Sequence, residues 1–337
     1  MRGTIAALLI AVALAVVLMV AGCSGAGVAA GDVRGDAVRT TAEDHLSAVL
    51  LFRSWTNVLH RRIPQPDGPE AGTSQGCAPE LNFEFLEDGS MRMWGTNSDC
   101  SVFEYITAAD QTTTGFIEWP NGMRMDGVWY PAEFDETFTN SSQRAVITFE
   151  DGMQLDYVYS TNIVTPLSPQ IMDGVARRPD GQQMDFRLSR TQNLEDYLVI
   201  DLPDGAHMET HVPLQAVPGT LYWPVFEAGA TGTYTSGTGR QLGFGLLGQD
   251  DRWETWEFEG GGNTTGAFTL SDGFGGAGQL MDGNDIVAAL RWADPSAGTL
   301  DILAATTWQV TPSAAARDFQ IDQWIANGAA LNPMPMY

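Results

Sequence analysis

A turn dipeptide, Asn-Gly or Asp-Gly, recurs along this chain at intervals that suit a pair of β-strands and a return connection. Its glycines are Gly122, Gly152, Gly181 and Gly205, and Gly89 lies in a fifth copy with one extra residue after the glycine. These dipeptides favour a two-residue hairpin turn in which both central residues have positive φ. The sequence therefore predicts a series of antiparallel hairpins, each with a glycine at its tip.

The residues that follow each turn alternate between apolar and acidic. The third residue after the glycine is apolar and the fourth is acidic in four copies, which are Met125 and Asp126, Leu155 and Asp156, Met184 and Asp185, and Met208 and Glu209. Successive strand residues point to opposite faces, so one face of the sheet is predicted to be buried and the other to face water. Equivalent strands of successive hairpins lie about 9–10 Å apart. The acids are thus too far apart to chelate calcium together, and we interpret them as a solvated face.

Two helices are expected to flank the strands. Residues 44–61 carry apolar side chains at helical spacing, and Asp44 suits a first helical turn. We expect the wide apolar face of this helix to pack on the sheet, with a lid or a partner-binding helix as the alternative. Near the C-terminus, Ser313 can cap a helix that reaches Asn327.

The amino-terminal residues have the pattern of an export signal. Arg2 is followed by an apolar run of 16 residues, 5–20, and small residues then precede Cys23. The sequence VAGC at 20–23 resembles the lipobox of bacterial lipoprotein signals. This resemblance implies cleavage before Cys23, acylation of its thiol and attachment to a membrane on the extracytoplasmic side. That membrane is the outer membrane in a Gram-negative cell and the plasma membrane in a Gram-positive cell. The alternative is an uncleaved anchor helix with an incidental cysteine.

The remaining cysteines are Cys77 and Cys100. Outside the cytoplasm a pair of cysteines is most often a disulfide, so we expect these two to be bonded. Two free buried thiols are the alternative.

These patterns divide the chain into a signal peptide (1–22), a lipidated flexible tether (23–42), a helix with hairpin-repeat strands (43–217), a Gly/Thr-rich β region (218–312) and a C-terminal helix and tail (313–337). The Gly/Thr-rich region is either a second meander or a continuation of the first sheet. The predicted fold is mainly β, an antiparallel meander of hairpins that forms a sandwich or an open or half-barrel sheet, with a helix at each end.

Charge composition narrows the range of partners. The net charge is −25, and all 17 basic residues are arginine. Such an acidic surface repels phosphate backbones, so nucleic acid is not an expected partner. The acidity suits cations, basic partners or a saline medium, and it also fits an ordinary extracellular surface from a genome that avoids lysine codons.

The segment HMETH contains the best candidate metal ligands, His207, Glu209 and His211. Imidazole and carboxylate groups bind zinc well. Along a strand, however, residues i and i+4 are about 13 Å apart, so the three side chains cannot all meet one ion. The polar face of a strand explains them equally well. The Gly-x-Ser-x-Gly match around Ser74 follows a proline-rich loop rather than a strand, so we interpret it as a coincidence. No catalytic residue and no cofactor are predicted.

The sequence thus indicates an exported, lipid-anchored envelope protein that acts as a non-catalytic binding or structural module. Its partner would be a protein, a glycan or an apolar ligand, and exposed rings such as Trp253 could bind sugars. One alternative is a carrier of an apolar or lipid ligand in a β half-barrel, and another is a metal-dependent hydrolase. A carrier needs a dry cavity lined by residues such as Trp119, Met125, Met184 and Met208, whereas a module needs these side chains packed solid.

Overall fold

The computed structural model describes residues 31–59, 77–97, 100–118, 122, 124–162, 170–191, 195–213, 229–249, 253–259, 264–271, 276–282, 285–294, 297–302 and 306–319. Residues Val38–Tyr337 form one compact unit, separate from Met1–Ala37. No helix within the ranges described has the length and apolarity needed to cross a lipid bilayer.

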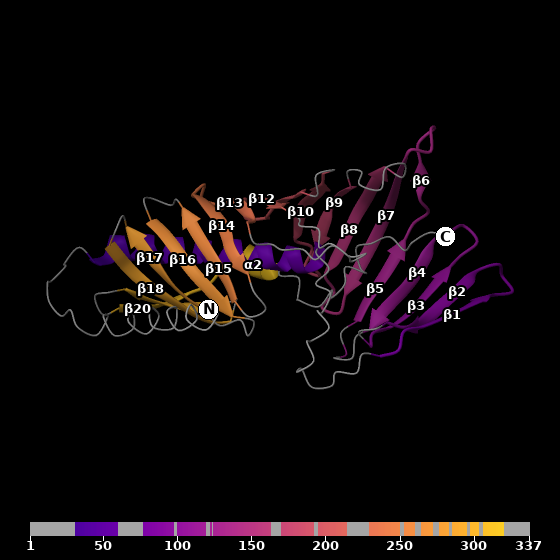
Figure 1. Ribbon diagram of the computed structural model, residues 1–337, viewed down its shortest axis with the longest axis horizontal. Helices are drawn as coiled ribbons and strands as arrows, with labels where there is room; N and C mark the ends of the chain where they lie inside the picture. The colour runs from indigo at the N-terminus through magenta and orange to yellow at the C-terminus, as the bar shows by residue number, and fades with distance from the viewer. Residues whose placement is uncertain are drawn as a thin grey trace, which may run out of the picture. The chain divides into compact units, whose positions relative to one another are not determined.

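The described strands form a single antiparallel sheet of 20 strands, and Figure 1 shows the meander. Each strand pairs with the next one in the chain, except that β5 pairs with β7 instead of β6. The strands are β1 Glu80–Phe85, β2 Met91–Thr96, β3 Val102–Thr107, β4 Thr113–Glu118, β5 Arg124–Trp129, β6 Glu133–Phe134, β7 Asn140–Phe149, β8 Gln154–Asn162, β9 Gln170–Arg177, β10 Gln183–Arg190, β11 Glu195–Asp201, β12 His207–Pro213, β13 Thr231–Thr235, β14 Gln241–Gln249, β15 Trp253–Glu259, β16 Thr264–Ser271, β17 Gly276–Asp282, β18 Asp285–Asp294, β19 Ala297–Ile302 and β20 Thr306–Val310.

The predicted mainly-β meander of hairpins is confirmed, and the sheet is open. Among the described strands, β1 pairs only with β2, and β20 pairs only with β19. Strand β12 pairs with β13 in continuous register from His207↔Thr235 to His211↔Thr231. Strands on both sides of residue 218 therefore belong to the same sheet.

The hairpin tips lie where the sequence predicts them, but the type of turn differs. Gly152 has φ +84°, whereas none of the described aspartates has a positive φ. Gly152 N donates to Phe149 O at 2.9 Å, and Phe149 N donates to Met153 O at 2.8 Å. This pattern is a type I turn followed by one left-handed residue, which makes a three-residue loop rather than the expected two-residue one. Asp151 Oδ1 favours it, because it accepts a hydrogen bond from Met153 N at 2.9 Å.

Two tips of the same kind lack glycine. Cys100 has φ +65° and Gln111 has φ +68°. Both backbone hydrogen bonds of the turn recur at residues 97–101 and 108–112. These tips were not predicted from the sequence, because the glycine that marks the others is absent.

The predicted alternation of buried and exposed residues is confirmed. Met125, Leu155, Met184 and Met208 are all 0–1 % exposed. Strand β12 alternates regularly, with Met208, Thr210 and Val212 buried on one face. The buried face of the sheet provides one wall of the hydrophobic core.

Helix α2, Gly31–Leu59, provides the opposite wall of the core. It begins well before the expected start, so residues 31–42, which were predicted to belong to the flexible tether, are helical. Val38, Ala42 and Leu46 are spaced four residues apart and are all buried. This spacing continues the apolar stripe toward the N-terminus, and burial of the stripe stabilises the additional turns.

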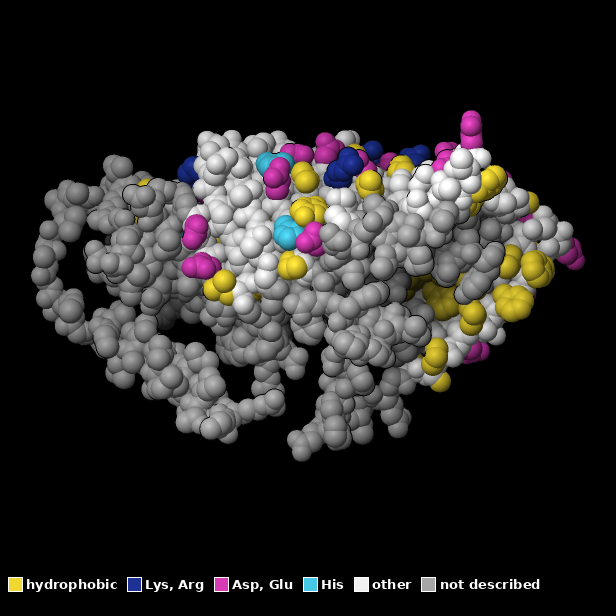
Figure 2. All heavy atoms as spheres, turned by 45° about the horizontal axis from the view of Figure 1, so that its top comes forward, with side chains coloured by type: hydrophobic (Ala, Val, Ile, Leu, Met, Phe, Trp, Pro, Cys, Tyr) yellow, Lys and Arg dark blue, Asp and Glu magenta, His cyan; other side chains and the backbone are white. Residues whose placement is uncertain are grey.

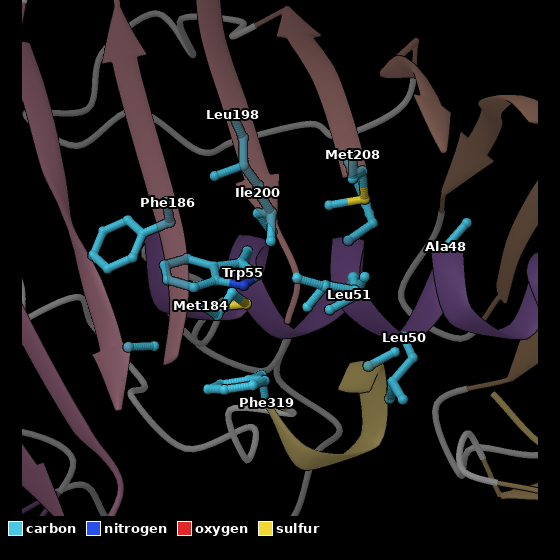
Figure 3. Packing of buried hydrophobic residues seen from close by; sticks show 14 of the residues in the cluster. Ala48, Leu50, Leu51, Trp55, Met184, Phe186, Leu198, Ile200, Met208 and Phe319 are labelled. Atoms are coloured by element: carbon cyan, nitrogen blue, oxygen red, sulfur yellow. The ribbon is translucent and has the colours of Figure 1, made fainter. Parts of the chain in front are cut away.

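The helix crosses several strands of the sheet. His45 stacks on Phe258 of β15 with ring centroids 4.2 Å apart, and Trp55 packs on Phe186 of β10 at 4.5 Å. Figure 3 shows Trp55 and Leu51 pointing toward side chains of β10 to β12. The expectation that the apolar face of this helix packs on the sheet is therefore correct.

Helix α3, Ala314–Asp318, begins at the predicted cap. Ser313 Oγ accepts a hydrogen bond from Ala316 N at 3.1 Å. The helix ends at Asp318, with the buried Phe319 as its C-cap, and therefore earlier than the expected Asn327. Residues 320–337 lie outside the described ranges.

Candidate functional site

His207 lies on the solvent face of β12 between two carboxylates. Its Nδ1 is 2.7 Å from Asp201 Oδ1, and its Nε2 is 3.1 Å from Glu209 Oε1. Partial burial disfavours protonation, but the hydrogen bonds to Asp201 and Glu209 outweigh it and raise the pKa of His207. Both ring nitrogens are thus engaged, so neither is open to a ligand.

His211 lies on the same face but belongs to a different cluster. Its ring stacks on Tyr197 of β11 at 4.8 Å, and its Nε2 is 3.7 Å from Glu195 Oε1. In Figure 2 the histidine side chains, in cyan, lie beside acidic ones. The structure therefore places the predicted ligands His207 and Glu209 together and His211 apart from them. Within the described ranges, no three His, Cys, Asp or Glu side chains are grouped as a metal site.

The predicted acidic face carries ion pairs with arginine. Asp156 lies between Arg144 and Arg177, at 2.9 Å and 2.8 Å, and these hydrogen bonds lower the pKa of Asp156 despite partial burial. Asp126 pairs with Arg124 at 3.0 Å. These contacts lie within one strand or between neighbouring strands, as expected for a solvated face.

The side chains proposed to line a carrier cavity are packed against protein. Met184 and Met208 lie in the cluster that includes Trp55 and Leu51, and Met125 belongs to the same core. A space large enough for a lipid would leave its lining side chains accessible, yet these methionines are 0–1 % exposed. Trp119 lies outside the described residues.

A short hairpin between β5 and β7 displays aromatic rings to solvent. We call residues 131–140 the aromatic arm, and Figure 1 shows β6 projecting beyond the neighbouring strands. Phe134 is 45 % exposed and Phe138 is 68 % exposed, and their rings lie 5.9 Å apart. Glu133 and Glu136 are exposed beside them. The tip therefore combines an apolar surface with negative charge.

The aromatic arm is held in shape by Asp135. Its carboxylate accepts hydrogen bonds from Thr139 N and Thr139 Oγ1, both at 2.8 Å, and from Asn140 Nδ2 at 2.7 Å. Desolvation alone would raise the pKa of Asp135, but the hydrogen bonds from Thr139 and Asn140 lower it well below its ordinary value. Phe138 is fixed at φ +53°, which is unfavourable for an aromatic residue. The turn therefore holds Phe138, which is 68 % exposed, in an unfavourable backbone conformation.

A second exposed apolar surface lies on β1 at the edge of the sheet. Leu81, Phe83 and Phe85 share one face and are 60 %, 67 % and 77 % exposed. Figure 2 shows apolar side chains gathered at this end of the molecule. Neither this surface nor the aromatic arm was predicted from the sequence. Alternating apolar residues predict a buried face. The sequence does not show that the apolar face of the sheet extends to β1, where these side chains are left exposed.

The expected disulfide is present between Cys77 and Cys100. It joins the segment before β1 to the turn between β2 and β3. Cys23, Ser74 and the residues of the export signal lie outside the described residues, and nothing is described of the side chain of Trp253.

No protein-family model, no curated protein and no solved structure matches this chain. The function must therefore be inferred from the surfaces themselves.

Proposed function

We propose that the protein is an exported, lipid-anchored binding module of the cell envelope, in which the aromatic arm contacts a protein partner. The observation that carries the proposal is the exposure of Phe134 and Phe138 on a turn that hydrogen bonds to Asp135 hold in place. Exposed aromatic rings are enriched at the centres of protein interfaces. A preformed arm loses little conformational entropy on binding, which favours affinity.

The packed core supports a binding module rather than a carrier. Met184 and Met208 are buried in the core between the sheet and α2, as expected for side chains packed against protein rather than lining a ligand space. The hydrolase alternative gains no support from His207, because both nitrogens of its ring are engaged by carboxylates.

The location rests on two observations. A disulfide between Cys77 and Cys100 suits an oxidising compartment. Residues 20–23 resemble a lipobox, and acylation at Cys23 would hold the module at the membrane surface.

A photo-crosslinking residue at position 138, in cells that make the full chain, tests the arm. We expect a discrete protein adduct from position 138 and none from position 182, which is an exposed turn residue elsewhere on the sheet. Position 182 controls for exposure alone. Equal adducts from both positions, or none from position 138, would refute the role of the arm.

Replacement of Cys23 by serine tests the anchor. Acylation requires the thiol, so Cys23→Ser should block processing or release the protein from the membrane fraction. Cys100→Ser is the matched control, because it also removes one sulfur but leaves the lipobox intact. Membrane attachment of Cys23→Ser equal to that of the parent chain would rule out lipidation while leaving the arm untested by this experiment.

A further inference from the structure

Strand β1 has the features of an open pairing edge. Within the described ranges it pairs with β2 alone, from Glu80↔Thr96 to Phe85↔Met91, without a bulge. Natural edge strands are commonly blocked by proline, lysine, bulges or inward-pointing charges. The strand ELNFEF contains no proline or lysine, and its two glutamates alternate with its apolar residues. Among the described residues, the edge therefore lacks the usual protection against pairing.

The backbone groups of β1 that face outward can be identified from the hairpin turn. Leu86 N donates to Ser90 O, so the backbone N–H and C=O groups of Leu86 point toward β2. The backbone groups of successive strand residues point to opposite edges of the strand. The N–H and C=O groups of Glu84 and Asn82 therefore also point toward β2. The N–H and C=O groups of Leu81, Phe83 and Phe85 therefore point away from the sheet. These are also the three apolar residues of β1, and their side chains are all exposed.

We propose that β1 pairs antiparallel with β1 of a second copy of this chain, in a register centred on Phe83. In this register Phe83 faces Phe83 of the second copy, and Leu81 faces Phe85 in both directions. The pairing uses the outward N–H and C=O groups of all three residues. It also places the three exposed apolar side chains of each copy on one shared face. The inference does not depend on the proposed function of the aromatic arm.

The opposite face of β1 is compatible with the same register. Asn82 faces Glu84 of the second copy, so an amide N–H can donate to a carboxylate across the interface. Glu84 is already 3.3 Å from Arg92 of β2, which reduces repulsion between the two copies of Glu84. Shifting the register by one residue would place Phe83 opposite Asn82 or Glu84 and would mix apolar with polar partners.

Single cysteines in the full chain test the register. In a hydrogen-bonded antiparallel pair the opposed Cα atoms are about 5.5 Å apart, which is within the range of a disulfide. Under mild oxidation we therefore expect Phe83→Cys to form a disulfide-linked dimer in at least roughly tenfold greater yield than Leu81→Cys. Leu81→Cys is the matched control, because it introduces one exposed thiol on the same face but lies opposite residue 85. Leu81→Cys and Phe85→Cys should cross-link when the two variants are mixed.

The parent chain provides the second measurement. Sedimentation over a concentration series should show a dimer, and Phe83→Pro should shift it to a monomer. Proline at this position removes an outward N–H, which β1 does not use to pair with β2. Under the same oxidation, the parent chain is the control for dimers that form through Cys23 rather than through a cysteine in β1. The proposal is overturned if the parent is a monomer, or if Phe83→Cys cross-links no more than Leu81→Cys. Slow maleimide labelling of Phe83→Cys in a monomer would also overturn it, since a lipid or another segment of the chain would then cover the edge.

Discussion

Gln111 stands at a left-handed position that glycine occupies in the matching turns. A residue with a Cβ costs roughly 1 kcal/mol more than glycine at such a φ. Gln111→Gly is therefore expected to raise the free energy of unfolding by about 1 kcal/mol in urea titrations. Gly181→Ala is the reverse change, and its added Cβ would meet nothing within 4 Å, so its cost comes from the backbone alone. A Gln111→Gly variant no more stable than the parent would contradict this account of the turn.

Cys100 combines a similar backbone cost with a stabilising covalent bond. Loss of the disulfide, which spans 23 residues, is expected to cost about 3 kcal/mol. Both Cys100→Ser and Cys100→Gly remove this bond, but glycine also relieves the left-handed strain. We expect Cys100→Gly to be about 1 kcal/mol more stable than Cys100→Ser in thermal or urea unfolding. Equal stabilities would show that the turn relaxes once the disulfide is lost.

His45 makes stability depend on pH. Burial lowers the pKa of His45 to about 3, below its value of 6.5 in an unfolded chain. The unfolded state therefore takes up a proton first as the pH falls. Stability from the neutral imidazole is complete above about pH 6.5 and should decrease by about 1.4 kcal/mol per unit below it. Urea unfolding at pH 7 and pH 5 measures this loss, and His45→Phe should remove most of it.

His207 affects stability in the opposite direction, which provides a control for His45. Its pKa is raised in the folded protein, so its contribution is complete below the unfolded pKa and is lost as the pH rises through the folded pKa. His207→Gln should therefore steepen the loss of stability on acidification that His45 causes. If His207→Gln abolished that loss, the assignment to His45 would be wrong.

At the scale of elements, α2 is joined to the sheet by both apolar and charged contacts. Leu51 is fully buried, and Arg240 of the β13–β14 turn forms a bidentate hydrogen-bonded pair with Asp44 at 2.9 Å. Burial raises the pKa of Asp44 although Arg240 opposes this shift. Leu51→Ala should cost about 2–5 kcal/mol of unfolding free energy, while Arg39→Ala on the exposed side should cost about 0.5 kcal/mol or less.

The elements also show how far the sequence determines the fold. The hairpin glycines and the alternation at Met125 and Met208 sufficed to predict the meander, because both are local patterns. The start of α2 was predicted too late, since the turns around Val38 and Ala42 are stabilised by tertiary burial rather than by local propensity. The aromatic arm was missed for a similar reason, because the sequence gives no sign that Phe138 is turned outward at a positive φ.

For the whole molecule, stability should vary along the sheet. Strands β10 to β12 pack on α2, whereas the apolar face of β1 remains exposed. Strand β1 is held to the rest of the sheet by its pairing with β2 and by the disulfide. Hydrogen exchange is therefore expected to be slowest in β11 and β12 and faster in β1 and β2. Reduction of Cys77–Cys100 should accelerate exchange in β1 and β2 only. Equal acceleration in β12 would show that the sheet opens as one unit.

The order of strands in the sheet matches their order of synthesis, so almost every strand leaves the ribosome just after its hydrogen-bonding neighbour. The helix is the exception. His45 and Trp55 can pack on the sheet only after β15 and β10 have been synthesised, well over a hundred residues later. The nascent chain thus carries an uncovered apolar helix through most of its production, and chaperones should recognise α2 more strongly than any hairpin.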